Sequence, residues 1–148
     1  MSSRLELSFD ATRQIRDACL CLHVQRAARA LARRFDDAFR PLGLTNGQFS
    51  LLMSLNRPEP ASIGAVATLL AMDRTTLTAN LKPLAKRGLV TVTVDPIDRR
   101  SRRLTLTPAG RAALAAAVPI WKRTHAAMER RLARPNADAL RADLCALS

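Results

Sequence analysis

The chain has 148 residues, of which 24 are Lys or Arg and 12 are Asp or Glu, so its formal net charge is +12 and its pI about 11.5. This length fits one ordinary domain, and this charge favours a polyanionic partner such as nucleic acid. The three cysteines are odd in number and lack metal-finger spacing, which argues against a disulfide scaffold or a zinc finger and fits a reduced cytosol.

The sequence also lacks the marks of membrane proteins, secreted proteins and enzymes. No segment approaches the roughly 18 consecutive apolar residues of a membrane span, and the N-terminus has no signal-peptide pattern. We therefore expect a cytoplasmic protein without a membrane partner. The chain has no Gly-rich phosphate loop, no paired-carboxylate motif and no nucleophile–base pair, so we expect no catalytic residue, no cofactor and no enzymatic activity.

The first dozen or so residues are expected to form a loose arm. A long helix is then predicted from about Asp17 to Leu42, because apolar residues alternate at spacings of three and four along one face. That face consists of Leu20, Val24, Ala27 or Ala28, Leu31, Phe35, Phe39 and Leu42. Thr45 and Gln48 form a capping-box pattern for the next helix, which the Pro-rich run at residues 57–60 ends.

Residues 62–88 predict two short helices with a tight break between them. Ser62 is a suitable N-cap, and the apolar residues after it follow a helical spacing. Ala71 and Met72 form the break, and Asp73 is the second N-cap. The buried stripe of the second helix is Leu77, Leu81 and Leu84, and Gly88 is a natural stop. Within this helix Pro83 predicts a bend or a poorly bonded turn.

The opposite face of the second helix carries short hydroxyls, an amide, a methyl group and cations. Such side chains can reach base edges and phosphates in the major groove of DNA. The candidate DNA-binding residues of this helix are Arg74, Thr75, Thr76, Thr78, Ala79, Asn80, Lys82 and Lys86.

Two alternating strands are predicted next, the first through Val90, Val92 and Val94 and the second through Leu104 and Leu106. Between them, the segment 95–103 is too long and too polar for a tight turn. It is expected to place four candidate DNA-binding residues on an exposed tip, Arg99, Arg100, Arg102 and Arg103. Arginine on a projecting loop suits a narrow minor groove, and Asp98 is expected to steady this wing through an ion pair.

After the wing, Thr107 and Pro108 begin a second long helix, which Pro119 is expected to interrupt. A last short helix is predicted from Asn136. The fold class is therefore mainly α with a small β-wing, a winged helix-turn-helix within a single domain spanning residues 1–148. The winged region is 45–107, and long apolar-faced helices flank it at 17–42 and 108–148.

The segments MDRTTLTANLKPLAKRGLV, DPIDRRSRRLTLTPAG and GLTNGQFSLL resemble the MarR family of bacterial transcription regulators. The resemblance covers roughly residues 19–131, and Asp98-Arg99-Arg100 followed by LTLTPAG is its most specific part. It implies a homodimer in which the first and last helices of two subunits interlock as a dimerisation layer. It also implies that the pocket between that layer and the winged region takes a small, often aromatic effector.

Cys19 and Cys21 are candidate thiol sensors. The resemblance places the reactive cysteine of peroxide-sensing relatives near the start of the first long helix, where Cys21 lies, although those relatives hold the thiolate with tyrosines and this chain has no Tyr. On one continuous helix, residues two apart point to nearly opposite sides and cannot form a disulfide. The alternative is that both cysteines are small core residues. Nothing in the spacing of the Cys and His residues demands a metal site.

The sequence thus predicts a homodimeric regulator, most simply a repressor, that binds double-stranded DNA at a pseudo-palindromic site and is released by a small ligand or by thiol oxidation. The alternative is an architectural DNA- or RNA-binding protein driven by its charge alone. A shortage of aromatic residues, 3% of the chain, argues against stacking on single strands.

Overall fold

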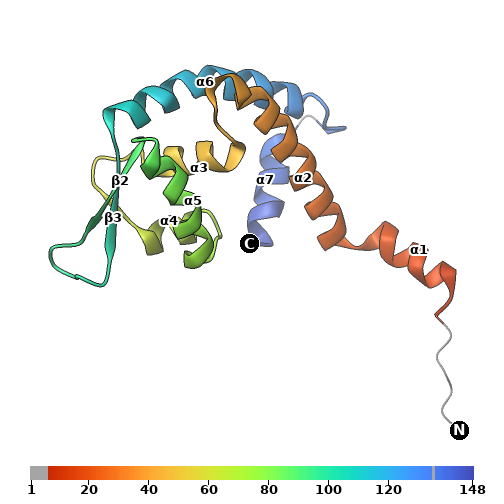
Figure 1. Cartoon of the computed structure of the whole chain (residues 1–148). Helices are drawn as coiled ribbons and strands as arrows, with labels where there is room; N and C mark the ends of the chain where they lie inside the picture. The colour runs from red at the N-terminus through yellow and green to blue at the C-terminus, as the bar shows by residue number, and fades with distance from the viewer. Residues whose placement is uncertain (1–6, 135) are drawn as a thin grey trace, which may run out of the picture.

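The computed structural model describes residues 7–134 and 136–148. Figure 1 shows two limbs that diverge from a shared top formed by a long helix. The elements, in chain order, are α1 (Phe9–Ala18), α2 (Leu20–Phe39), a 3-10 turn η1 (Arg40–Leu42), α3 (Asn46–Ser54), β1 (Ala61–Ser62), α4 (Ile63–Leu69), α5 (Arg74–Lys86), β2 (Val90–Val94), β3 (Arg102–Leu106), α6 (Pro108–Glu129) and α7 (Ala137–Ala146). The predicted fold class, mainly α with a small β-wing, is confirmed.

Side-chain caps explain where the helices begin. Thr45 and Gln48 form the predicted capping box at the start of α3. Ser62 caps α4 and Asp73 caps α5, each by accepting the N–H of the residue three positions later. Thr107 does the same for α6, with Pro108 at the first helical position. These short-range bonds satisfy amides that a helix start otherwise leaves unpaired, and they are readable from the sequence.

The N-terminal region differs from its prediction. Of the expected loose arm, residues 1–6 lie outside the described residues, and the helix α1 begins at Phe9 with Ser8 as its N-cap. The expected single helix from Asp17 to Leu42 is wrong, because Cys19 adopts an extended conformation with ψ 110° and separates α1 from α2. The Cys19 sulfur accepts the N–H of Leu22, so this residue serves as the N-cap of α2.

The two internal prolines do not break their helices. Pro83 lies within α5 and Pro119 within α6, and both helices continue across them. The expected interruption at Pro119 is therefore wrong. Each proline removes one helical hydrogen bond, but both rings are exposed. The buried residues on either side, such as Leu81 and Leu84 in α5, hold the helix against the core.

The core lies where the winged region meets α2 and α6. Phe39 is fully buried and stacks on Phe49 of α3, with ring centroids 4.8 Å apart. Leu77, Leu81 and Leu84 of α5 are buried as predicted. Phe39, which was predicted on the apolar face of the first long helix, therefore acts in packing together with Phe49.

The sheet has three antiparallel strands in the order β1-β3-β2. The short strand β1, where Ala61 pairs with Leu104, was missed by the sequence analysis. In β2 only Val90 is buried, whereas Val92 and Val94 are 41% and 51% exposed. The alternation of valines and threonines predicts a strand with one buried face. This expectation is wrong beyond Val90, because the hairpin projects past the core (Figure 1). None of the helices in the described ranges is both long and apolar enough to cross a membrane.

Candidate nucleic-acid interface

Helix α5 is held by its buried stripe and by its cap. The Asp73 carboxylate accepts the Thr76 N–H and the Thr76 hydroxyl, both at 2.8 Å. These hydrogen bonds from Thr76, first the backbone and then the side chain, lower the pKa of Asp73 below its ordinary value. With Leu77 and Leu81 packed into the core, the orientation of the opposite face is fixed before any ligand arrives.

Every predicted DNA-binding residue of α5 is exposed: Arg74, Thr75, Thr76, Thr78, Ala79, Asn80, Lys82 and Lys86. Two of the hydroxyl groups are already engaged, since Thr76 donates to Asp73 and Thr78 donates to the Arg74 carbonyl at 2.8 Å. Within the described residues, no side-chain hydrogen bond is made by Arg74, Thr75, Asn80, Lys82 or Lys86. They are therefore the donors on this face that a base edge or a phosphate can take without first breaking a bond inside the helix.

The wing is ordered by two aspartates at the start of its loop. Asp95 accepts the N–H groups of Ile97 at 2.8 Å and Asp98 at 3.1 Å, and its other oxygen is 3.0 Å from Nε of Arg103. The two backbone bonds, followed by the bond from Arg103, lower the pKa of Asp95. The pair therefore remains charged at neutral pH and fixes the base of the loop.

Asp98 supports the wing, but not through the ion pair that the sequence predicted. Its carboxylate accepts the Arg100 N–H and the Ser101 hydroxyl, both at 3.1 Å, and its carbonyl accepts the Ser101 N–H at 2.9 Å. The ion pair belongs to Asp95 and Arg103 instead. Asp95 was missed as a support, although an aspartate before a proline is a recognisable turn signal.

The four wing arginines separate into two groups. Arg99 and Arg100 lie in the exposed loop, where they were expected. Arg102 and Arg103 belong to β3 rather than to the tip, so their predicted position is corrected, and neighbouring strand residues point to opposite faces. Arg103 is half-buried against Asp95, and Arg102 donates to the carbonyls of Arg99 and Ser101 at 3.3 Å. Arg100 is thus the tip arginine whose own N–H is anchored by Asp98 while its guanidinium stays exposed.

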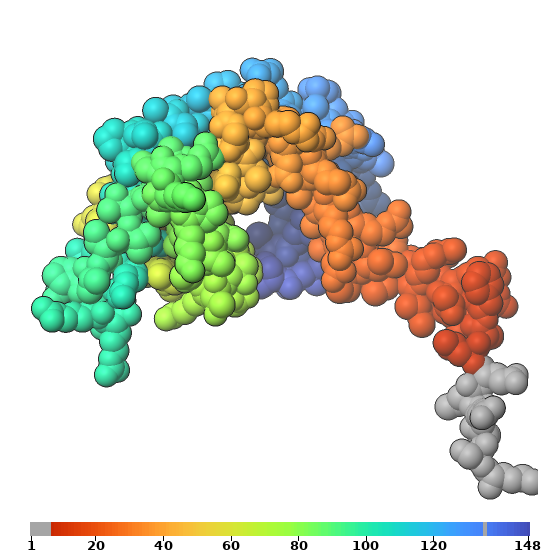
Figure 2. Space-filling model, viewed as in Figure 1, coloured from red at the N-terminus to blue at the C-terminus, as the bar shows by residue number. Residues whose placement is uncertain are grey.

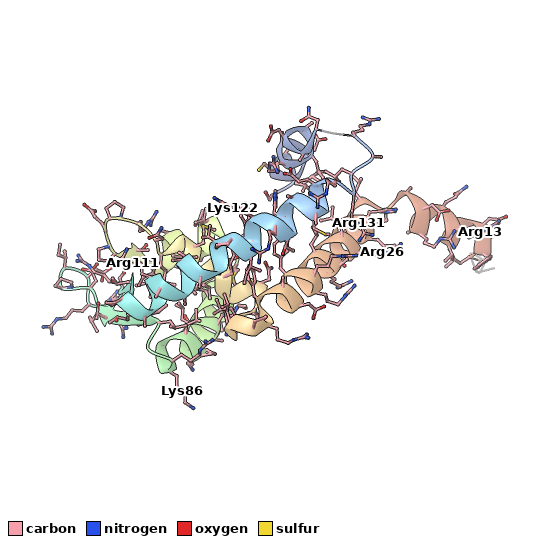
Figure 3. All side chains as sticks on the ribbon, turned by 90° about the horizontal axis from the view of Figure 1, so that it is seen from above. Arg13, Arg26, Lys86, Arg111, Lys122 and Arg131 are labelled. Atoms are coloured by element: carbon pink, nitrogen blue, oxygen red, sulfur yellow. The ribbon has the colours of Figure 1, made fainter. Side chains whose placement is uncertain are left out.

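The space-filling view in Figure 2 shows the wing as a projecting finger beside the α4–α5 region, well separated from the limb formed by α1 and α2. Figure 3, seen from above, shows long basic side chains along α6 and α2 as well, among them Lys122 and Arg26. Positive charge is therefore spread over the molecule. What distinguishes the winged region is that exposed hydroxyls and an amide, those of α5, lie there beside a projecting basic loop.

The cysteines are all free thiols. Cys19 is half-buried, and Cys21 and Cys145 are exposed. Because Cys19 lies in the break before α2, Cys19 and Cys21 are not members of one helix, so helical geometry does not exclude a disulfide between them. The alternative of two small core residues does not fit Cys21 in this chain, whose sulfur accepts a hydrogen bond from the Gln25 amide at 3.3 Å at the surface.

The histidines have ordinary partners. His125 is half-buried, stacks on Trp121 with centroids 4.7 Å apart, and lies 3.6 Å from Glu129, with which it pairs when protonated. His23 is exposed and lies 2.7 Å from the Cys19 carbonyl. In the part of the chain that the structure describes, no three His, Cys, Asp or Glu residues come together as metal ligands would.

An extensive apolar surface remains uncovered on the terminal helices. Most of the exposed large apolar side chains of the described residues belong to α1, α2, α7 or the segments beside them: Leu7, Phe9, Ile15, Leu20, Val24, Leu31, Leu132, Leu140, Leu144 and Leu147. Of these, Leu20, Val24, Leu144 and Leu147 line one shared hollow between α2 and α7, and contiguous apolar surface of this kind marks an interaction site. The part of α2 that is buried, at Phe35 and Phe39, is the part nearest α3.

Comparison with known proteins identifies relatives of this arrangement. The model of the MarR family matches residues 44–101. The transcriptional regulator MosR of M. tuberculosis, solved in complex with DNA, is 38% identical, with 87% of this chain and 92% of that chain covered and a TM-score of 0.79. The transcriptional repressor CouR, bound to a 23-mer DNA duplex, is 33% identical, with 96% and 98% covered and a TM-score of 0.78.

A curated relative gives a shorter match. The transcriptional activatory protein BadR of Rhodopseudomonas palustris is 35% identical over 95 residues, which are 62% of this chain and 54% of BadR. The match therefore spans little more than half the length of BadR.

Proposed function

The chain belongs to the MarR family and is a DNA-binding transcriptional regulator, and from this premise we propose that it is a sequence-specific repressor that binds a pseudo-palindromic site as a homodimer. The observation that carries the proposal is the fixed, exposed polar face of α5 beside the ordered basic wing. The family is one of transcription regulators rather than enzymes, so the protein acts by occupying DNA.

Helix α5 is the part that reads the major groove in this proposal. Asn80 suits an adenine edge, and Lys82 a guanine edge or a nearby phosphate. Ala79 offers a methyl group to a thymine, and Thr75 offers a free hydroxyl. Lys86 and Arg74, at the two ends of the helix, face phosphates and set its register on the duplex.

The wing supplies a minor-groove contact. Arg100 is the residue we assign to the groove, because Asp98 fixes its backbone while its side chain is exposed. A narrow minor groove concentrates negative potential and favours an inserted arginine. Arg99 and Arg102 lie close enough along the chain to contact the flanking phosphates, whereas Arg103 acts chiefly by supporting the loop through Asp95.

The homodimer is supported by the uncovered apolar surface of α1, α2 and α7. Val24 and Leu31 of α2 are 39% and 43% exposed, and Leu144 of α7 is 42% exposed. A second copy related by a twofold axis would cover this surface and present two α5 helices to successive major grooves, roughly 34–36 Å apart. A site read by such a dimer is a pseudo-palindrome.

Release from DNA is assigned to a small ligand or to oxidation of a thiol. Either event would act by changing the separation of the two α5 helices, since a rigid dimer matches one half-site spacing. Cys21 is the better candidate of the two sensor cysteines, because it is exposed in the single chain, whereas Cys19 is half-buried and its sulfur caps α2.

The proposal is tested by binding of the purified protein to DNA flanking its own gene and to a scrambled duplex, at about 0.15 M salt, where non-specific binding is weak. A preference of about a hundredfold or more, with one dimer per site, supports a specific regulator. Equal, steeply salt-dependent binding to many unrelated duplexes would instead support the alternative function, an architectural protein whose binding is driven by the net charge of +12. Placing the site upstream of a reporter then separates repression from activation.

A further inference from the structure

One side chain connects the end of α5 to the turn at Gly43, which is far from α5 in the sequence. Arg87 directly follows α5, and its Nη1 donates to the Gly43 carbonyl at 2.7 Å, across 44 positions of sequence. Gly43 connects η1 to α3 and has a φ of +65°, a left-handed conformation that favours glycine. The carbonyl that receives Arg87 is thus held in place by a turn that few other residues adopt.

Hydrogen bonds connect the segment around this turn to α2. The Asp36 carboxylate accepts the N–H of Asn46 at 2.7 Å, which ties α2 to the first residue of α3. The Gly43 N–H donates to the Arg40 carbonyl at 2.9 Å. These hydrogen bonds therefore connect the turn at Gly43 to α2, which is one of the helices that carry the uncovered apolar surface.

The chain just after Arg87 is held by the other long helix. The Thr107 hydroxyl donates to the Gly88 carbonyl at 2.6 Å, and the Thr107 N–H donates to the Leu89 carbonyl at 3.1 Å. Thr107 is also the N-cap of α6. Residues 87–89 are consequently hydrogen-bonded on two sides. Arg87 bonds to the turn that follows α2, and Gly88 and Leu89 bond to Thr107 at the start of α6.

We propose that Arg87 is a positioning residue for DNA recognition, which fixes the orientation of α5 relative to α2 through the Gly43 carbonyl. This inference rests on the proposed function, because orientation matters only if two α5 helices must fit one site together. A cation at the C-cap of a recognition helix would more commonly be assigned to a DNA phosphate. The structure instead shows this guanidinium bonded to Gly43, and a Cβ on Gly43 would lie 3.5 Å from its second terminal nitrogen.

The two roles differ in what they do to binding. A bond that pre-orients α5 lowers the ordering cost of specific binding, leaves non-specific binding unchanged, and sharpens the preference for one half-site spacing. A phosphate contact strengthens binding to every duplex, and its loss in both subunits of a dimer reduces the slope of log K against log salt by about two. Arg87 reaches Gly43 through Nη1 alone, and a lysine side chain ends one bond short of that nitrogen. Arg87→Lys should therefore lose this bond, whereas a lysine ammonium can still contact a phosphate as a point charge.

The experiment measures DNA affinity over a range of salt for the parent protein, Arg87→Met and Arg87→Lys. Each protein is titrated with three duplexes: the specific duplex, the same duplex with one base pair inserted between the half-sites, and a scrambled duplex. Lys86→Met is measured beside them as the neighbouring cation that makes no hydrogen bond within the described residues. Unfolding midpoints of all variants establish that they are folded at the temperature used.

The proposal expects both Arg87 variants to lose about three- to tenfold in affinity for the specific duplex, with the salt slope and the scrambled-duplex affinity unchanged. The penalty for the inserted base pair should shrink. Unchanged specific affinity, or a lower slope with equal losses on all duplexes and recovery in Arg87→Lys, would overturn it. If the parent protein itself fails to distinguish the specific from the scrambled duplex, the proposed function fails instead.

Discussion

Asp95 and Arg103 form an ion pair across the base of the wing, with Oδ2 of the aspartate 3.0 Å from Nε of the arginine. Because Asp95 opens the loop and Arg103 lies in the returning strand β3, this bond joins the two sides of the hairpin. The same carboxylate accepts two backbone N–H groups of the loop, so Asp95 holds the first half of the loop, while Asp98 holds the second half.

Replacing Asp95 by Asn should loosen the wing and weaken specific DNA binding severalfold, while the core remains folded. The pKa of Asp95 is lowered, first by the Ile97 and Asp98 N–H groups and then by Arg103. A carboxyl with a lowered pKa stabilises the fold above its unfolded value of about 3.9, and this contribution is lost as the pH falls through the lower folded value. Amide hydrogen exchange or NMR of residues 95–101 between neutral pH and pH 3 should show the loop loosening only at the acid end. Loosening between pH 5 and 7 would contradict this account.

Replacing Arg100 by Ala should weaken binding to the specific duplex severalfold or more and reduce its salt dependence, because a cation leaves the minor groove. Lys122 of α6, at the shared top of the molecule rather than on the wing (Figure 3), gives a charge-matched control. The Lys122→Ala variant should bind nearly as the parent does in an equilibrium titration. Equal affinities for parent and Arg100→Ala would count against the assignment of the wing.

The substitution Gly110→Ala should destabilise the protein by about 1–3 kcal/mol, as overpacking does. A Cβ at Gly110 would lie 2.0 Å from the Leu89 carbonyl oxygen and 3.2 Å from Cδ2 of Leu106, so backbone would have to move. Gly47, in the first turn of α3, is the matched control, since its Cβ would meet only the Thr45 hydroxyl at 3.9 Å. Gly47→Ala should be neutral or stabilising by up to about 1 kcal/mol. Chemical denaturation gives the free energy of unfolding of each variant, and equal values for Gly110→Ala and Gly47→Ala would refute the steric argument.

Replacing Leu144 by Glu should separate the proposed dimer into folded monomers, because the charge would enter the surface that a second copy covers. Met53 of α3 has a similar exposure, 46% against 42% for Leu144, but lies outside the terminal helices. Sedimentation should therefore show Met53→Glu as a dimer and Leu144→Glu as a monomer with weakened operator binding. A Leu144→Glu protein that sediments like the parent would show that α7 does not contribute to the interface.

Replacing Cys21 by Ser should leave DNA binding intact and remove its sensitivity to hydrogen peroxide, if oxidation of this exposed thiol releases the DNA. Cys145→Ser is the matched control, since Cys145 is also exposed, and it should keep the response of the parent. The readout is the fraction of operator bound as peroxide is added. Full binding by Cys21→Ser with undiminished sensitivity would rule out Cys21 as the sensor.

Features that depend on neighbours within one helical turn or one strand pair could be predicted from the sequence. The caps at Thr45, Ser62, Asp73 and Thr107, the buried stripe of α5 and the stop at Gly88 all follow from local hydrogen bonds and apolar spacing. Together with the basic loop between two alternating segments, they were sufficient to predict a winged helix-turn-helix and the exposed face of α5.

Contacts between groups that are distant in the sequence could not be predicted and are seen only in the folded chain. The pairing of β1 with β3, the ion pair of Asp95 rather than Asp98, and the bond from Arg87 to Gly43 depend on chain segments that local patterns do not relate. The continuity of α6 through Pro119 was decided in the same way, because packing on both sides of the proline outweighs one missing hydrogen bond. Local rules select each element, whereas the shared core sets where the elements touch, and the geometry of the DNA-binding surface depends on those contacts.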